Sequence, residues 1–177
     1  NVALVALGMP LAATSALSMR LDVLVRLLPG AGQRLAAILA DAIAIHGALV
    51  IAIGGAGVAA LIGGTSTVLG LPESLRFAAF AIGGGLTVLL LLWRAALDRS
   101  AAAALASLLL GIGLYLAAQS TTGLSLTTPS LVAALAAGIG LLIGAPLPFA
   151  LLAGVSLSGP FGGLLPDPVR DHMKNYW

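Results

Sequence analysis

ILADAIAIHGALVIAIGGAGVAALIG, residues 38–63, is apolar at almost every position, and Asp41 and His46 are its only ionisable side chains. A helix that crosses a bilayer needs about 20 such residues, so this run is long enough. Its apolar residues do not alternate with period two, as they would in a membrane β-barrel. Lipid offers no water to backbone N–H and C=O groups, so the run must satisfy them within a helix. The sequence therefore predicts a membrane-spanning α-helix.

Four further apolar runs occupy residues 1–19, 75–93, 101–118 and 130–157. The 177-residue chain is 60% hydrophobic and 8% charged, whereas a soluble domain carries about 25% charge. We therefore predict an all-α, polytopic transmembrane helix bundle with about five membrane-spanning helices. Because the chain starts at Asn1 and not at Met, we expect that its natural N-terminus, including one upstream span, is missing.

The basic residues between the runs predict an orientation. If the five spans alternate, the loops on one face are 20–37, 94–100 and 159–177, and those on the other are 64–74 and 119–129. Excess Lys and Arg mark the cytoplasmic side, so the first three segments should be cytoplasmic. The basic residues of that face are Arg20, Arg26, Arg34, Arg94, Arg99, Arg170 and Lys174, against Arg76 alone on the other.

Two places look suited to the membrane interface. Residues 19–29, MRLDVLVRLLP, place leucines and valines at helical spacing, which predicts a short amphipathic helix whose Arg20 and Arg26 reach lipid phosphates. A continuation of the first span is the alternative. Trp93 beside Arg94 is predicted to be an interfacial anchor.

Glycines cluster within or at the ends of the apolar runs. No strand precedes them and no Lys-Ser/Thr pair follows, so they are not expected to bind nucleotides. Packing inside a bilayer depends on small residues that let backbones touch, so we predict close helix contacts at these glycines. Pro146 and Pro148 should bend or break the run 130–157. The predicted packing residues are Gly54, Gly57, Gly83, Gly84, Gly85, Gly140 and Gly144.

Few ionisable residues are candidates for chemistry. His46 inside its run could serve a proton or a ligand, or could be a neutral histidine bonded to a neighbouring helix. Asp41 is close enough to the cytoplasmic end to reach water or Arg34, with coupling-ion binding as the alternative. Glu73 and Arg76 are predicted to form a surface ion pair, and contact with a periplasmic partner is the other interpretation.

Several classes of function are not expected. The chain has no Cys, so disulfides and thiolate metal sites are excluded. No His cluster has metal-ligand spacing, no two carboxylates lie close together in a span, and no Ser has a plausible base. We therefore expect no metal, no cofactor and no enzyme activity. The net charge of +2 is too small and too dispersed to suggest nucleic acid as a partner.

The order of residues resembles a known family. LGMPLAA at 7–13, MRLDVLV at 19–25 and Leu28-Pro29 resemble the small membrane subunit of the TRAP (tripartite ATP-independent periplasmic) transporters. LGLPESLR at 69–76, followed by AIGGG at 81–85, is similar to the last periplasmic loop and fourth span of that subunit. Ser18 stands where the family often has His, which puts a role tied to that imidazole in doubt.

A second resemblance follows. Residues 139–154, IGLLIGAPLPFALLAG, resemble the opening span of the large TRAP subunit, and residues 101–118 stand where fused transporters have a connecting helix. The resemblance implies four parts: 1–97 as a small-subunit-like domain, 98–129 as connecting helix and external loop, 130–158 as the first large-subunit span, and 159–177 as a polar tail of unknown role. The tail reflects either a truncated or altered chain or a natural small protein.

The resemblance implies a function. The protein would be a scaffold component of a sodium-coupled transporter in the bacterial inner membrane, taking up organic acids such as dicarboxylates or sugar acids. Its partners would be membrane lipids, the large TRAP subunit and a periplasmic substrate-binding protein. The large subunit's functional residues have no counterpart in this sequence. A membrane assembly or structural protein unrelated to transport is the alternative.

Overall fold

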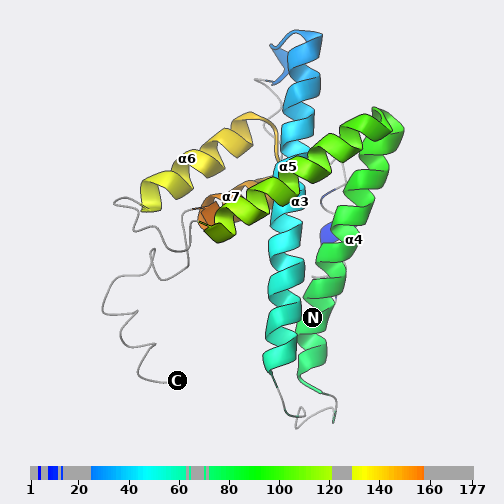
Figure 1. Ribbon diagram of the computed structural model, residues 1–177, viewed down its shortest axis with the longest axis vertical. Coiled ribbons are helices and arrows are strands. Elements are labelled where there is room, and N and C mark those ends of the chain that lie inside the picture. The colour runs from blue at the N-terminus through cyan, green and yellow to red at the C-terminus, as the bar shows by residue number, and fades with distance from the viewer. Residues whose placement is uncertain are drawn as a thin grey trace.

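The computed structural model describes residues 4, 8–11, 13, 25–62, 64, 70, 72–120 and 129–157. The regular elements of this part are helices, which assemble into a bundle (Figure 1). This confirms the predicted all-α membrane architecture. The helices are α3 (Gly30–Leu61), α4 (Ser74–Asp98), α5 (Ala101–Ser120), α6 (Pro129–Leu142) and α7 (Leu147–Leu157).

Helix α3 is the longest element that the structure describes. Its 32 residues correspond to about 48 Å at 1.5 Å per residue, well beyond the ~30 Å of a hydrocarbon core. The prediction that residues 30–37 belong to a loop is wrong, because α3 already begins at Gly30. Pro29 occupies its N-cap, and the Gln33 side chain donates to the carbonyl oxygen of Leu28 at 3.0 Å. The helix therefore extends past the apolar run.

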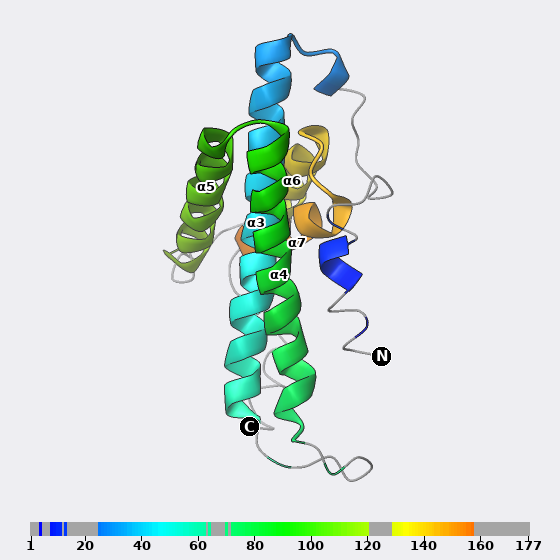
Figure 2. The same ribbon diagram turned by 90° about the vertical axis from the view of Figure 1, so that its right-hand side faces the viewer.

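Helices α3 and α4 form a long antiparallel pair, and α5 folds back beside them (Figure 2). Helix α4 continues to Asp98, five residues past the predicted end of its apolar run, and only Arg99 and Ser100 separate it from α5. Ser100 starts the next helix, because its Oγ accepts a hydrogen bond from the N–H of Ala103 at 3.1 Å. The corner between α4 and α5 is therefore tight.

The core lies along the middle of α3, which contacts α4, α5 and α7. Ile45 and Ala48 of α3 are fully buried there with Leu91 of α4 and Phe149 of α7. Ala13, from the first predicted span, is also buried in this cluster. Three of the described helices, α3, α4 and α5, are long and apolar enough to cross a membrane, whereas α6 and α7 are shorter apolar helices.

The predicted fifth span is a helical hairpin and not a single crossing. Helix α6 ends at Leu142 and α7 begins at Leu147. Gly144 has a φ of +88°, and the N–H of Ala145 bonds to the carbonyl oxygen of Gly140 at 2.9 Å, which closes a glycine cap at the end of α6. The break expected from Pro146 and Pro148 is thus present, but the chain reverses there.

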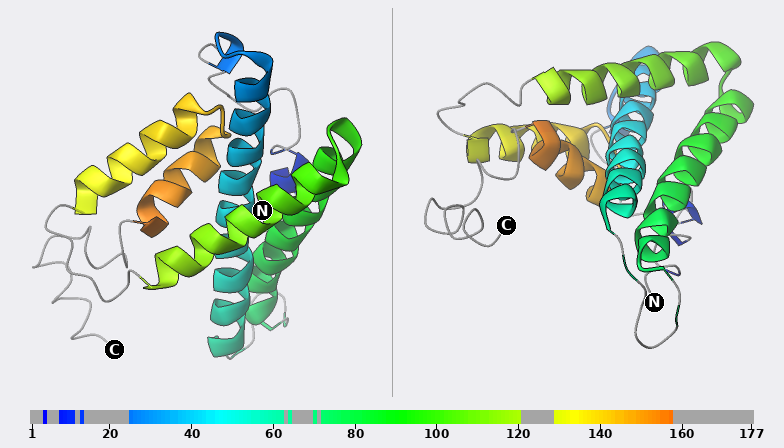
Figure 3. Two further views of the ribbon diagram at one scale, coloured as in Figure 1. Left: turned by 45° about the horizontal axis from the view of Figure 1, so that its top comes forward. Right: turned by 60° about the horizontal axis from the view of Figure 1, so that its bottom comes forward.

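The two short helices lie side by side (Figure 3). Late residues of α7 face early residues of α6: a Cβ on Gly154 would meet Ala137, and Ala150 lies against Gly140. The turn of the hairpin lies near Ala40, in the first half of α3, where Ala40, Ala145 and Ala150 form a small buried cluster. The start of α6 and the end of α7 are therefore at the same end of the hairpin, so the prediction of one crossing over 130–157 is wrong.

Some predictions fall on other parts of the chain. Of the predicted interfacial helix at 19–29, only Val25 and Arg26 are helical among the described residues. Arg20 lies outside the described residues, as do most of the first predicted span, most of the 119–129 connection and the tail from residue 158 onward.

Candidate functional site

A buried polar contact lies at the centre of the bundle. His46, midway along α3, is fully buried, and its Nε2 is 2.6 Å from Oγ of Ser156 in α7. The Ser156 hydroxyl donates its hydrogen to the carbonyl oxygen of Ala153 at 3.0 Å. The serine oxygen is thus the acceptor, and the His46 proton belongs on Nε2. His46 is thus bonded to a neighbouring helix, as one of the two alternatives above expects, and a role with a proton or a ligand stays a prediction.

The other ring nitrogen of His46 remains an acceptor. Nδ1 is buried and has no hydrogen-bond partner among the described residues. The ring of Tyr115 in α5 lies nearby, with 6.4 Å between ring centroids, and its hydroxyl accepts a hydrogen bond from Gln119 at 3.0 Å. The hydrogen bond from His46 to Ser156 therefore joins α3 to α7, and the Tyr115 ring of α5 packs beside it. An interhelical hydrogen bond of this kind favours one arrangement of the helices.

An ion pair joins α3 to the corner between α4 and α5. Asp41 is buried, and its Oδ2 accepts a hydrogen bond from Nη1 of Arg99 at 2.7 Å. The predicted contact of Asp41 with Arg34 is not formed among the described residues, because the fold brings Arg99 to it across a sequence separation of 58 residues. This ion pair links α3 to the corner between α4 and α5, and binding of a coupling ion by Asp41 stays a prediction.

The predicted interfacial residues that the structure describes are exposed, and one of them forms an ion pair. Trp93 is 66% exposed, and Arg94 pairs with Asp98, one helical turn away, at 3.2 Å. Arg26 is exposed. Contact with lipid remains a prediction for these residues.

The predicted Glu73–Arg76 ion pair is not formed among the described residues. Glu73 precedes the first turn of α4, and its carbonyl oxygen accepts the N–H of Arg76 at 3.1 Å. The Glu73 backbone N–H bonds back to Gly64 at 3.1 Å. The arginine side chain is exposed, so the two residues are linked through the backbone. Their contact with a periplasmic partner stays a prediction.

Glycines make the closest helix approaches. A Cβ on Gly84 of α4 would lie 2.6 Å from the carbonyl oxygen of Ala48 in α3. One on Gly55 would lie 2.9 Å from Phe80, and one on Gly111 of α5 would lie 2.7 Å from Ile45. A side chain at any of these three positions would push helices apart.

The predicted packing glycines divide into two groups. Gly83 and Gly84 are buried in α4, and Gly140 and Gly144 are buried in and after α6. Among the described residues, no atom lies within 4 Å of a Cβ built on Gly54, Gly57 or Gly85. The packing assigned to those three has no counterpart within the described chain, where all three are exposed. Contact with another subunit at these positions stays a prediction.

The other buried hydroxyls are satisfied within their own helices. Thr87 Oγ1 donates to the carbonyl oxygen of Gly83 at 2.7 Å, and Ser107 Oγ donates to that of Ala104 at 2.9 Å. No group of three or more His, Asp or Glu that could hold a metal ion occurs in the described part. The polar groups here link helices in pairs and do not converge on a common point.

Sequence reasoning missed three members of these contacts: Ser156, Arg99 and Tyr115. Each comes from a different part of the chain than its partner. The available signal was the general rule that a buried polar group needs a partner, which predicts that His46 and Asp41 are paired but does not say with what.

Comparison with known proteins assigns the family. Residues 1–101 match the family model described as Tripartite ATP-independent periplasmic transporters, DctQ component. This match covers α3, α4 and their connection and stops at the first residue of α5. No curated protein and no solved structure matches the chain. The family consists of transporter membrane subunits and not of enzymes. With more than half of its residues matched, the chain belongs to the DctQ family of TRAP transporter membrane components.

Proposed function

We propose that this protein is the scaffold component of a sodium-coupled TRAP transporter in the bacterial inner membrane. It would support the uptake of organic acids such as dicarboxylates or sugar acids. A large membrane subunit and a periplasmic substrate-binding protein would be its partners. Family membership supports the transport context. The scaffold role rests on the structure of the central helix.

One observation carries the scaffold proposal: the ionisable groups of α3 that lie in the bundle are used to join helices. Asp41 is paired with Arg99, and His46 is bonded to Ser156. A site for a coupling ion needs several oxygen ligands that converge, often at a broken helix. In the part of the chain that the structure describes, no group of three or more His, Asp or Glu side chains could hold a metal ion. The exposed apolar surfaces of α3, α4 and α5 suit contact with lipid or with another subunit.

We also propose a fused arrangement. Residues 1–97 would be the small-subunit domain, 98–129 the connecting helix with its external loop, 130–158 the start of the large-subunit region, and 159–177 a separate tail. The end of the family match at the first residue of α5 supports the first boundary. The hairpin of α6 and α7 packs on α3 through Gly47 and Phe149, so this region would be docked on the small-subunit domain.

The charge bias supports a cytoplasmic location for the corner between α4 and α5. Arg94 and Arg99 lie at this end of the bundle, and Arg34 in the second turn of α3 lies beside it. A membrane assembly protein unrelated to transport is disfavoured by the family match. Bacterial inner-membrane location follows from the same proposal, since a periplasmic partner requires a periplasm.

Reconstitution tests the proposal. The 177-residue chain in liposomes with an inward sodium gradient and the binding protein should show no uptake of a radiolabelled organic acid. Co-reconstitution with its large subunit should give uptake that collapses when sodium is replaced by potassium. Uptake by the chain alone would mean that a transport site exists within these helices. His46→Leu is the variant to examine in that case, because Nδ1 is the buried acceptor without a partner among the described residues.

A further inference from the structure

A polar cavity of about 500 Å³ lies where the first turns of α3 face the corner between α4 and α5. Arg34 and Ile38 line it from α3, and Asp98, Arg99 and Ser100 line it from the corner. Alanines of the first turns of α5 complete the wall. The small alanine side chains leave the guanidinium groups accessible from the cavity.

The charges around this cavity do not cancel. Arg99 is paired with Asp41, and Arg94 is paired with Asp98. Arg34 is exposed and makes no ion pair or side-chain hydrogen bond with any residue that the structure describes. One positive charge therefore has no counter-ion among the residues that the structure describes. The positive end of the α5 dipole lies at the same place, beside the negative end of the α4 dipole, so the excess positive charge is that of Arg34.

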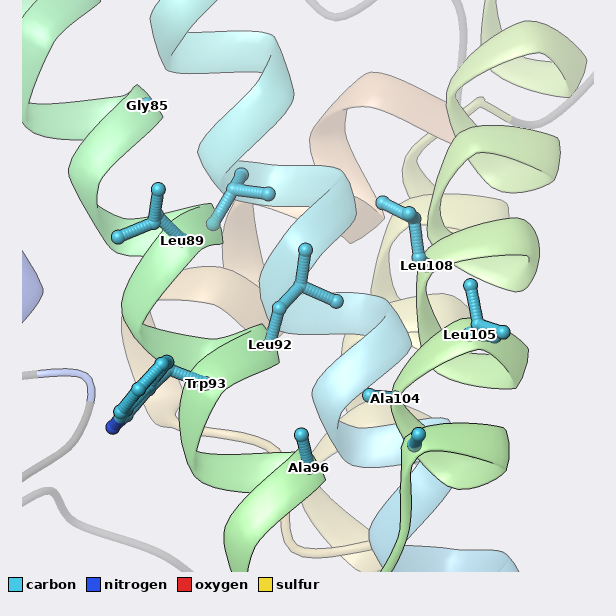
Figure 4. A pocket seen from close by; sticks show the side chains of 10 residues that line it. Gly85, Leu89, Leu92, Trp93, Ala96, Ala104, Leu105 and Leu108 are labelled. Atoms are coloured by element: carbon cyan, nitrogen blue, oxygen red, sulfur yellow. The ribbon is translucent and has the colours of Figure 1, made fainter.

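An apolar groove begins beside the cavity. It has a volume of about 660 Å³ and runs between α4 and α5, from Ala101 next to Ser100 of the cavity toward Gly85. Leu89 and Leu92 line it from α4, and Leu105 and Leu108 line it from α5, with α3 behind (Figure 4). From Ala96 to Gly85 it is about 16 Å long at 1.5 Å per residue, close to the ~15 Å of one lipid leaflet.

We propose that this corner binds one anionic phospholipid. Its phosphodiester would lie in the cavity at Arg34 and the start of α5, and an acyl chain would lie in the groove. Basic pockets between membrane helices are known to hold anionic headgroups, and a guanidinium bonds two phosphate oxygens at once. A zwitterionic lipid fits less well, because its ammonium group needs an acidic partner. Asp41 and Asp98 are both already paired.

Native mass spectrometry of the detergent-purified chain tests the proposal. The chain is titrated with phosphatidylglycerol and, separately, with phosphatidylethanolamine of the same acyl chains. Phosphatidylglycerol should bind more tightly. Arg34→Gln should weaken the binding of phosphatidylglycerol roughly fivefold, which is the effect expected for one basic residue near a lipid phosphate. The preference for phosphatidylglycerol over phosphatidylethanolamine should then disappear. Arg34→Lys should retain most of the preference for phosphatidylglycerol.

Two controls separate a site from a general charge effect. Arg76→Gln removes an equal charge at the opposite end of α4 and should leave lipid binding unchanged. Ala96→Phe fills the groove and should lower occupancy, whereas Leu97→Phe adds a ring on the same turn outside the groove lining and should not. Both alanine and leucine at these positions are exposed, so folding should survive.

Several results would overturn the proposal. Equal binding of the two lipids, or no effect of Arg34→Gln, would show that the cavity does not recognise an anionic headgroup. Displacement of the lipid by millimolar inorganic phosphate would indicate a site for free anions. Loss of bound lipid on assembly with the large subunit would assign the groove to a protein helix.

Discussion

His46 Nε2 lies 2.6 Å from Ser156 Oγ and thereby joins the middle of α3 to the last turns of α7. The first residue lies within the DctQ family match and the second lies outside it. Because His46 is fully buried, water does not compete for this hydrogen bond in the packed bundle. The contact therefore favours a fixed position of the α6–α7 hairpin on α3.

Removing the acceptor should destabilise the bundle. Ser156→Ala leaves the Nε2–H of His46 buried without a partner, so we expect a loss of about 1–2 kcal/mol in the free energy of unfolding. Adding His46→Leu should recover part of this loss, because both polar groups are then gone. Unfolding in mixed detergent micelles, followed by circular dichroism, measures both effects. Ser107→Ala, which breaks a bond within one helix, is the control and should cost less.

The buried ion pair predicts an asymmetry between single and double variants. Arg99→Ala leaves Asp41 buried and uncompensated, and we expect a loss of roughly 1–3 kcal/mol, below the cost of a fully buried pair because Arg99 is partly exposed. Asp41→Ala combined with Arg99→Ala should be less harmful than Arg99→Ala alone. Asp98→Asn, in the exposed pair with Arg94, should change stability by less than about 1 kcal/mol. Equal costs at both pairs would contradict the burial argument.

Neighbouring glycines in α4 offer a matched comparison of packing. Gly84→Leu places atoms where Ala48 and Ala52 of α3 already lie, so we expect it to cost roughly 1–3 kcal/mol and to lower the melting temperature in detergent. Gly85→Leu, one residue further along, meets open space among the described residues, at the far end of the groove between α4 and α5, and should not lower the melting temperature of the isolated chain. If Gly85→Leu weakens only the assembled transporter, this face of α4 is a subunit contact. Tolerance of leucine at Gly84 would refute the close approach.

The hairpin predicts which side of the membrane the chain reaches after residue 157. Single cysteines at Thr122 and Gly163 should react with an impermeant thiol reagent from the same side, which is the side that Ser66→Cys reports. A cysteine at Ser100 should react only from the other side. A single crossing over 130–157 would instead place Thr122 and Gly163 on opposite sides. If Gly163→Cys reacts as expected, Arg170 and Lys174 no longer count toward the basic face, and the charge bias of seven to one becomes five to three.

The membrane character and helical class of this protein could be read from composition and run length. An apolar run of about 20 residues in lipid must be a helix, because its backbone has no other hydrogen-bond partners there. The break at Pro146 and Pro148 was also predictable, since proline lacks the N–H that a helix needs. These conclusions depend on local chemistry, which the linear order of residues contains.

The reversal at Gly144, the pairing of His46 with Ser156 and that of Asp41 with Arg99 required the folded chain. A proline break is compatible with a kinked crossing or with a turn, and the packing of Gly154 on α6 selects the turn. Likewise, chemistry alone says that a buried polar group needs a hydrogen-bond partner. The identity of that partner depends on which helices lie side by side, and residues 58 or 110 positions apart become neighbours only through packing.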